Sequence, residues 1–349
     1  MSLYRWTLAG IVGFLLLTTA HAQSDDGADP LFQSTDVLEA RIVAPINRIL
    51  RERSDTEDVD GKFQYTDDTG ELIEVDIGIR TRGISRLNED ICPFPPLRLD
   101  FKKSQIKKSL FHKQDKLKLV THCRDRSSRY EQTLLNELLA YRILNELTDV
   151  SFRVRLLHIT YVDTDGRDSD RIRYGFLIEH KDRLAKRLGL KPLALERTTV
   201  KALRPDYTNL ISVFHYMIGN TDFSPIAGPD AECCHNHVLL GEEDALLLSV
   251  PYDFDQAGLV DAPHGTTNPR FKLRSAKQRL YRGRCTNNEH LDTTLALYSS
   301  KREAIYKMID AQPGLNDKHR KKMTRYLDSF YKILGSPKQV ERQLVKKCI

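Results

Sequence analysis

The sequence predicts an α+β fold of two lobes, in which a strand-rich lobe with one helix precedes a lobe built mainly of helices. Apolar and polar residues alternate at 74–80, 96–101 and 116–121, which is typical of half-buried strands. Apolar residues recur at helical spacing within 129–147, which indicates an amphipathic helix. Helical spacing dominates the second half of the chain, so the two halves differ in their predicted secondary structure.

The N-terminal residues have the features of a secretory signal peptide. Arg5 precedes an uncharged apolar stretch, and an Ala-His-Ala cleavage pattern ends the segment 1–22. The apolar stretch is short for a bilayer-spanning helix and no later segment is apolar enough, so we expect no membrane span after cleavage. A flexible leader at 23–35 should precede the strand-rich lobe at 36–180 and the helical lobe at 181–349. The sequence thus predicts a secreted or periplasmic protein.

The strand-rich lobe is expected to be one sheet with an inserted helix. An Asp-Thr-Gly turn at 68–70 is typical of a hairpin that leads into the strand at 74–80. Two further strands are predicted at 152–164 and 173–179, after the helix, with a charged hairpin between them.

The helical lobe is expected to begin with a helix at 207–219, because its apolar residues share one face and Gly219 is a typical helix stop. Two short apolar runs further on can pair as a hairpin, and closing helices are predicted at 300–311 and 318–334. A strand-rich lobe followed by a helical lobe with a small acid-bearing hairpin is the layout of a protein-kinase-like fold.

The chain contains six cysteines, an even number that in an exported protein indicates disulfide bonds. We expect Cys92 to pair with Cys123, because both lie in the strand-rich lobe. Cys233 or Cys234 can pair with Cys285, since neighbouring cysteines rarely bond to each other. A zinc site in the Cys-Cys-His-Asn-His segment is the alternative, but four ligands within five residues do not easily form a tetrahedron.

The charge of the chain is mildly positive. Its formal net charge is +6, and removal of the single charged residue of the signal peptide lowers it to +5. Lys and Arg are interspersed with nearly as many Asp and Glu, and no long basic run occurs. We therefore expect no nucleic-acid binding.

Acidic and amide side chains follow the predicted helix and hairpin in a fixed order. Asp222 follows Gly-Asn-Thr at the helix stop, Asn236 precedes a strand-like run, and Asp253 and Asp255 end the next such run. Phosphoryl transfer requires an acid to accept a hydroxyl proton, and Asn and Asp oxygens to hold a magnesium ion on the phosphates. The alternative is that each residue stabilises a local turn.

This ordered set resembles the spore-coat protein H (CotH) kinase-like family and, more remotely, the HipA toxin kinases. The resemblance covers 70–260 approximately, including the strand and helix at 116–147 and a Tyr-Gly-Phe-Leu-Ile-Glu strand that leads to the interlobe hinge. It implies a catalytic role for Asp222. It also implies that the divalent metal binds to the residues that match the family's metal-binding positions, which are Asn236, Asp253 and Asp255.

The same resemblance implies a nucleotide site. Glu137 would orient a phosphate-binding base, either Arg98 or Lys118, and Glu179 would mark the hinge beside the nucleotide base. ATP would be the phosphate donor with Mg²⁺ or Mn²⁺, and a protein hydroxyl the acceptor.

Two features depart from the family pattern. The loop between Asp222 and Asn236 is long and contains two cysteines, and no Gly-rich phosphate loop is evident. Arg80, Arg82 and Arg86, which follow one another closely, can replace such a loop by binding phosphate with their side chains.

Four other polar residues have a simpler interpretation. His215 and His237 are expected to be structural histidines. Arg282 and Arg284 are expected to be surface charges, with binding of a substrate anion as the alternative.

Three functions compete on this sequence. An exported phosphotransferase is the first, and a pseudokinase or envelope scaffold is the second, because little ATP is present outside the cytoplasm. A haloacid-dehalogenase-type phosphatase is the third, because an apolar strand precedes Asp-x-Asp. In that fold the motif opens the domain, whereas here it lies late in the chain.

Overall fold

The computed structural model describes residues 27–166, 169–228, 233–242 and 244–349. The predicted signal peptide lies outside the described residues. Part of the segment predicted to be a flexible leader is packed against the fold instead, because the short helix α1 (Pro30–Gln33) buries Leu31 and Phe32 completely or nearly so. The core therefore begins earlier than the polar composition of the leader indicates.

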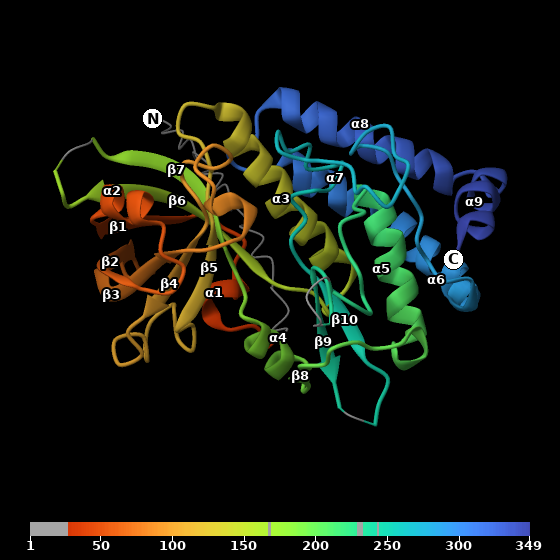
Figure 1. The fold of residues 1–349 in the computed structure, drawn as a ribbon, viewed down its shortest axis with the longest axis horizontal. Helices are drawn as coiled ribbons and strands as arrows, with labels where there is room; N and C mark the ends of the chain where they lie inside the picture. Colours follow the sequence, from red (N-terminus) through yellow and green to blue (C-terminus); the bar gives the residue numbers. More distant parts are fainter. Residues whose placement is uncertain (1–26, 167–168, 229–232, 243) are drawn as a thin grey trace, which may run out of the picture.

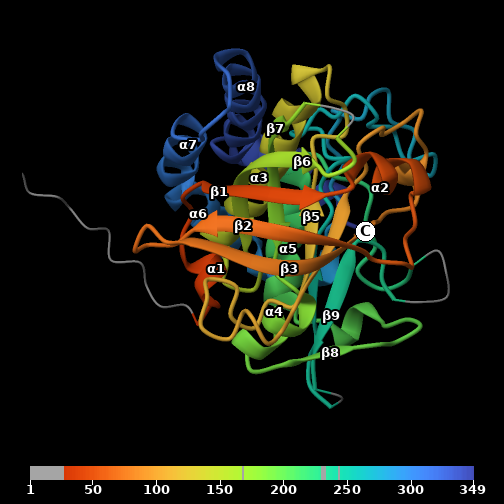
Figure 2. The ribbon, with the colours of Figure 1, turned by 90° about the vertical axis from the view of Figure 1, so that its left-hand side faces the viewer.

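The first half of the chain forms a closed barrel of seven strands in the order β1-β2-β3-β4-β5-β7-β6. Figure 2 shows β1, β2 and β3 side by side in its wall. The strands are β1 (Leu38–Ala44), β2 (Val59–Thr66), β3 (Leu72–Thr81), β4 (Leu97–Phe101), β5 (Lys116–Val120), β6 (Val154–Asp163) and β7 (Arg171–Ile178).

A parallel pairing closes the barrel. β1 pairs with β6 from Leu38 opposite Leu157 to Ala44 opposite Asp163, whereas all other neighbours in the barrel are antiparallel. A closed mixed barrel with a separate three-stranded sheet and helices is not a two-lobed kinase-like fold, so that prediction is wrong. The alternation of each strand shows which face is buried but not which distant strand it joins, and the closing pair is far apart in sequence.

Alternating residues of these strands fill the barrel interior. Phe63 of β2 and Phe101 of β4 are almost completely buried, as is Phe111 from the segment between β4 and β5, and the three ring centroids lie 4.6 to 5.3 Å apart. Such aromatic contacts each contribute roughly 0.5–1.5 kcal/mol beyond area burial. The predicted strand faces at 74–80, 96–101 and 116–121 are thus confirmed.

The helix α3 (Ser128–Leu147) joins the barrel to the rest of the molecule. It packs against β6 and β7 on one side and against α7 and α8 on the other, as Figure 1 shows. Most of its residues are buried, including the polar Asn136 and Glu137, so it is a central element rather than a surface helix.

The second half contains the predicted helix and hairpin. The helix α5 (Pro205–Ile218) ends at Gly219 in the left-handed conformation, which confirms the predicted helix stop. The hairpin of β9 (His237–Gly241) and β10 (Leu248–Pro251) is also confirmed, with β8 (Lys191–Leu193) as a third strand beside β9. The remaining helices of the described part of the chain are α2 (Ile46–Glu52), α4 (Lys181–Arg187), α6 (Leu291–Ser300), α7 (Arg302–Asp310), α8 (Asp317–Leu334) and α9 (Pro337–Gln343). This part of the chain also contains four short 3₁₀ turns, η1 (Ser85–Leu87), η2 (Val200–Ala202), η3 (Cys285–His290) and η4 (Val345–Lys347).

All six cysteines lie in pairs at disulfide distance. The predicted Cys92–Cys123 pair is confirmed. Cys285 pairs with Cys348 rather than with a member of the Cys-Cys sequence, whose two cysteines pair with each other. Those two expectations are corrected, because spacing alone does not show that the end of the chain returns to η3.

Within the described ranges, no helix is long and apolar enough to cross a membrane. The paired cysteines are consistent with an extracellular protein.

Candidate functional site

Charged side chains from three parts of the fold approach one another where the barrel, α3 and the segment after β10 meet. The barrel contributes arginines from the β3–β4 loop and a lysine from β5, α3 contributes a glutamate, and the segment after β10 contributes two aspartates. We call this set the polar cluster; it consists of Arg82, Arg86, Lys118, Glu137, Asp253 and Asp255.

The Gly-Asn-Thr-Asp sequence forms a tight turn that positions Asp222. The backbone amide of Asn220 donates to the carbonyl of His215, and its buried side-chain Oδ1 accepts from the amide of Asp222 at 2.9 Å. His215 is itself buried, with Nε2 3.1 Å from Nε2 of His237. The two histidines therefore support the turn from behind and do not face an open site.

Gly219 should tolerate no side chain. Its φ is +67°, and an added Cβ would lie 2.0 Å from the Tyr326 hydroxyl oxygen. That hydroxyl donates a hydrogen bond to the carbonyl of Lys277. We expect Gly219→Ala to lower the free energy of unfolding by about 2–4 kcal/mol, because about 1–2 kcal/mol of left-handed strain adds to the clash. Chemical denaturation measures this. Gly189→Ala is the matched control, since Gly189 has φ +68° and open space around it, and an equal loss in both variants would contradict the packing argument.

The carboxylate of Asp222 is held by two residues across its loop. Oδ1 lies 2.9 Å from Nε2 of His235, and Nδ2 of Asn236 donates to the Asp222 carbonyl at 2.8 Å and to Oδ2 at 3.2 Å. About a third of the Asp222 side chain stays exposed (35%), so the carboxylate is accessible from solvent. An isolated bridge between Ser224 and His235 brings the two sides of the loop together.

Asn236 and Asp253 lie side by side at the end of the β9–β10 hairpin. The amide of Tyr252 donates to the Asn236 carbonyl at 2.9 Å, and the amide of Asp253 donates to the Tyr141 hydroxyl at 2.8 Å. Both residues have positive φ, 55° for Asn236 and 61° for Asp253. Residues held in this sparsely populated region are frequent at functional sites, although Asn and Asp tolerate it best.

The Asp253 carboxylate has no hydrogen-bond or ion-pair partner among the residues that the structure describes. Burial raises its pKa, repulsion from Asp255 adds to this, and the nearby Arg86 and Arg82 oppose it. A partly buried carboxylate that is left unpaired beside arginines is unfavourable in the free protein unless something binds there.

Lys118 faces the same region. Its Nζ lies 5.0 Å from the centre of the Tyr252 ring, and the described part of the chain places no carboxylate within ion-pair distance of it. Burial, with repulsion from Arg82, lowers the pKa of Lys118 to about 8. Arg98 lies directly opposite Lys118 in the β4–β5 register and adds a further cation.

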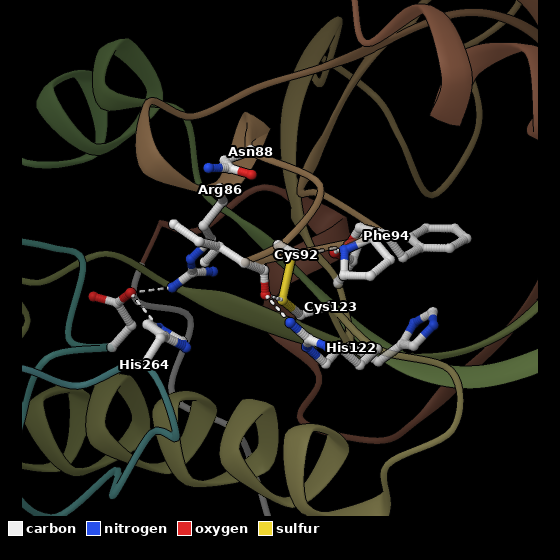
Figure 3. The surroundings of a disulfide bond; sticks show 12 residues. Arg86, Asn88, Cys92, Phe94, His122, Cys123 and His264 are labelled. Carbon is white, nitrogen blue, oxygen red and sulfur yellow. Dashed lines mark hydrogen bonds and ion pairs between the residues drawn. A yellow bond between two sulfur atoms is a disulfide. The ribbon is translucent and has the colours of Figure 1, made fainter.

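Asp255 is engaged differently from Asp253. Arg86 forms an ion pair with its Oδ2, and His264 Nε2 lies 3.0 Å from the same oxygen. Figure 3 labels Arg86 and His264. Burial works against its ionisation, but Arg86 and His264 hold the pKa of Asp255 well below its usual range. Asp255 therefore anchors the β3–β4 loop, and we do not place it among the metal ligands.

The β3–β4 loop is fixed from several sides. The Cys92–Cys123 disulfide ties its end to the segment after β5 (Figure 3), and Arg53 donates to the carbonyls of Leu87 and Cys92. Arg86 thus comes from a cross-linked loop rather than from a Gly-rich one.

Three residues that the sequence assigns to the phosphate or nucleotide site are either paired with other residues of the protein or buried. Arg80 donates to Asp58 at 2.8 Å on the barrel surface. Both oxygens of Glu179 accept from Arg187, and this pair is almost completely buried, so Glu179 stabilises the β7–α4 connection. Glu137 is buried, and burial raises its pKa strongly while Arg86 opposes the rise.

Two residues of the site were not assigned to it from the sequence. In the sequence His235 stands out only as a ligand of the alternative zinc site, and no pattern singles out His264. The order of His235 directly before Asn236 was the available signal, but only the folded loop shows that it faces Asp222.

Within the described ranges, no three His, Cys, Asp or Glu side chains are grouped so that they could hold a metal ion. The two cysteines of the alternative zinc site, Cys233 and Cys234, are paired with each other. Two surface hollows, one on the barrel and one beside α3, are lined by other residues. Comparison with protein-family models, characterised proteins and solved structures gives no match.

Proposed function

We propose that the protein is an exported phosphotransferase that binds ATP with Mg²⁺ or Mn²⁺ at the polar cluster. It would transfer the terminal phosphoryl group to a hydroxyl of an acceptor protein. The observation that carries the proposal is that Lys118, Arg82 and the Asp253 carboxylate converge without pairing to one another or to other described side chains. The proposal rests on this site and not on the fold, since similar chemistry occurs on unrelated folds.

The cations suit the phosphates of a nucleotide. Arg82, Arg98 and Lys118 have no acidic partner in the described part of the chain, and all three are partly buried. Cations withdrawn from water are costly unless they are paired, and phosphate oxygens are good partners for guanidinium and ammonium groups. A bound triphosphate would supply the missing negative charge.

Asp253 and Asn236 suit a divalent cation that is completed by phosphate oxygens. Magnesium is typically held by one or two carboxylates plus the phosphates of the substrate, so a cage of three acids is not required. Nδ2 of Asn236 donates hydrogen bonds to Asp222, which leaves Oδ1 of Asn236 as the oxygen that can bind the cation. The cation would neutralise charge on the phosphates when it is bound.

Asp222 is placed to accept the proton of the acceptor hydroxyl. As the hydroxyl oxygen bonds to the terminal phosphorus, the bond to the bridging oxygen breaks and ADP leaves, and the proton passes to Asp222. His235 and Asn236 hold the carboxylate in one orientation. The paired cysteines and the predicted signal peptide support a secreted or periplasmic site of action.

The proposal is tested by titrating the purified protein with ATP in a calorimeter, with and without Mg²⁺, and by following transfer from terminally labelled ATP. We expect binding that depends on the cation and incorporation of label into protein. Binding without transfer to any acceptor would favour the scaffold function, and no binding would contradict the proposal.

The affinity for ATP should depend on pH through Lys118. Its lowered pKa means that the ammonium is charged below about pH 8 and loses its charge as the pH rises through this value. We expect ATP affinity to fall by roughly 10-fold or more above this range, the scale of one charged hydrogen bond. Lys118→Arg should abolish this dependence, because arginine stays protonated.

Lys116→Arg is the matched control, since Lys116 lies on the same strand but pairs with Asp100 on the barrel surface. It should keep the pH profile of the wild type. Equal profiles for Lys118→Arg and the wild type would remove Lys118 from the phosphate site.

A further inference from the structure

The segment between the last acid of the site and η3 is strongly basic. We call residues 270–284 the basic strip. It contains seven Lys and Arg and no Asp or Glu, whereas the formal net charge of the whole chain is +6. The excess positive charge of the molecule is therefore concentrated in this strip; its basic residues are Arg270, Lys272, Arg274, Lys277, Arg279, Arg282 and Arg284.

The strip is fixed beside the proposed catalytic acid. Nη1 of Arg282 donates to the carbonyl of Thr221 at 3.2 Å and to the carbonyl of Phe223 at 2.8 Å, the residues on either side of Asp222. The same guanidinium lies 4.3 Å from the centre of the Phe223 ring and 4.7 Å from that of Phe271. One end of the strip is thus pinned to the loop that presents Asp222.

Some of the basic residues are occupied within the protein. Arg279 donates to the carbonyls of Met217 and Tyr326, and Lys277 pairs with Asp261. These contacts attach the strip to α5 and α8.

The remaining cations are not paired. Arg270, Lys272 and Arg274 are exposed, and no described side chain forms an ion pair or hydrogen bond with their charged groups. Arg284 is likewise unpaired among the described residues, and both Arg270 and Arg284 lie close enough to repel Arg282. Like charges held together in this way create a positive field beside Asp222 that attracts an anionic partner.

We propose that the basic strip binds an acidic stretch of the acceptor protein and so places a nearby hydroxyl at Asp222. This inference deepens the proposed function and depends on it. It specifies the substrate class as a protein with clustered Asp or Glu beside the accepting residue. The positive field would act on the association rate and would weaken as salt is added.

An acidic protein fits better than a nucleic acid. Binding of single-stranded nucleic acid generally uses exposed aromatic rings on which bases stack. Phe271 of the strip is covered by Arg282, and the neighbouring Phe223 is stacked on His215 with the ring centroids 3.7 Å apart, so neither ring offers an open platform. The paired cysteines also point to a compartment without nucleic acid as a normal partner.

The test uses a fluorescent peptide with one serine beside a run of glutamates, and measures its binding to the protein by anisotropy. We expect binding that weakens with salt. Reversing three unpaired charges with Arg270→Glu, Lys272→Glu and Arg274→Glu should weaken peptide binding by at least about 10-fold. The affinity for ATP should be unchanged, which also shows that the variant is folded.

The matched control reverses three exposed lysines of the β4–β5 loop, with Lys107→Glu, Lys108→Glu and Lys113→Glu. It makes the same change in net charge and should bind the peptide like the wild type. Equal weakening in both triple variants would mean that net charge and not the strip binds the peptide, and would overturn the inference.

Other outcomes separate the inference from the proposed function. ATP binding without peptide binding would contradict the strip while leaving the nucleotide site intact. Peptide binding without ATP binding would contradict the proposed function, and with it the placement of an accepting hydroxyl at Asp222, but would leave the strip as a binding site for acidic protein segments. Tighter binding of a single-stranded oligonucleotide than of the acidic peptide would overturn the assignment to an acidic protein.

Discussion

Replacing Asp253 with alanine should abolish metal-dependent binding of ATP. Its carboxylate is the only acidic oxygen ligand that we assign to the divalent cation, and it has no partner among the described residues that could compensate. Loss of a residue that merely supports a metal ligand typically weakens binding 10–100-fold, so we expect loss of the ligand itself to cost about 100-fold or more. Calorimetric titration with ATP and Mg²⁺ measures the change, and an affinity equal to that of the wild type would contradict the assignment.

A second variant separates the charge of Asp253 from its strained backbone. Asp253→Asn keeps a residue that tolerates positive φ but removes the carboxylate. Because the raised pKa means that the fold disfavours the charged form, the penalty is present well above that pKa and disappears as the acid is protonated. Thermal unfolding should therefore show Asp253→Asn to be as stable as the wild type, or more stable, at neutral pH. This difference should shrink in acid, and ATP binding should be lost at either pH.

Asp222→Asn should reduce phosphoryl transfer by about 100-fold or more, the scale typical of losing a general base. ATP affinity and thermal stability should stay close to the wild type. The turn depends on the backbone amide of Asp222, which donates a hydrogen bond to Oδ1 of Asn220. The Asp222 side chain does not take part in this bond and is about a third exposed (35%). The measurement is transfer from labelled ATP, with a melting curve of the same preparation.

Asp206→Asn is the matched control, because Asp206 is an exposed acid at the start of α5 that pairs with Arg204. It should transfer phosphate like the wild type. Equal transfer by Asp222→Asn and the wild type would remove Asp222 from the mechanism. Loss of ATP affinity in Asp222→Asn would instead show that Asp222 organises the nucleotide site.

Local patterns in the sequence predicted most of the elements that carry the site. The helix α5 and its end at Gly219 follow from apolar spacing and a residue suited to positive φ, and the β9–β10 hairpin from two apolar runs. Each of these signals arises from residues that are close to one another in the sequence. The order of Asp222, Asn236 and Asp253 could therefore be read before their geometry was known.

The barrel could not be predicted in the same way. Its closure depends on β1 pairing with β6 across more than a hundred residues, and the apolar alternation of either strand is equally compatible with an open sheet. The sequence also does not show that Asp255 forms an ion pair whereas the Asp253 carboxylate has no partner among the described residues. Asp255 is neutralised by Arg86, a residue of the β3–β4 loop that only the closed barrel brings to it.

The most direct test of the site is a crystal structure of the protein with Mn²⁺ and a non-hydrolysable ATP analogue, in which anomalous scattering locates the manganese. Mn²⁺ replaces Mg²⁺ with similar oxygen ligands and gives a distinct signal. We expect manganese bound to the Asp253 carboxylate and Asn236 Oδ1, with the phosphates against Lys118. A nucleotide bound at another surface, or manganese with neither Asp253 nor Asn236 as a ligand, would contradict it.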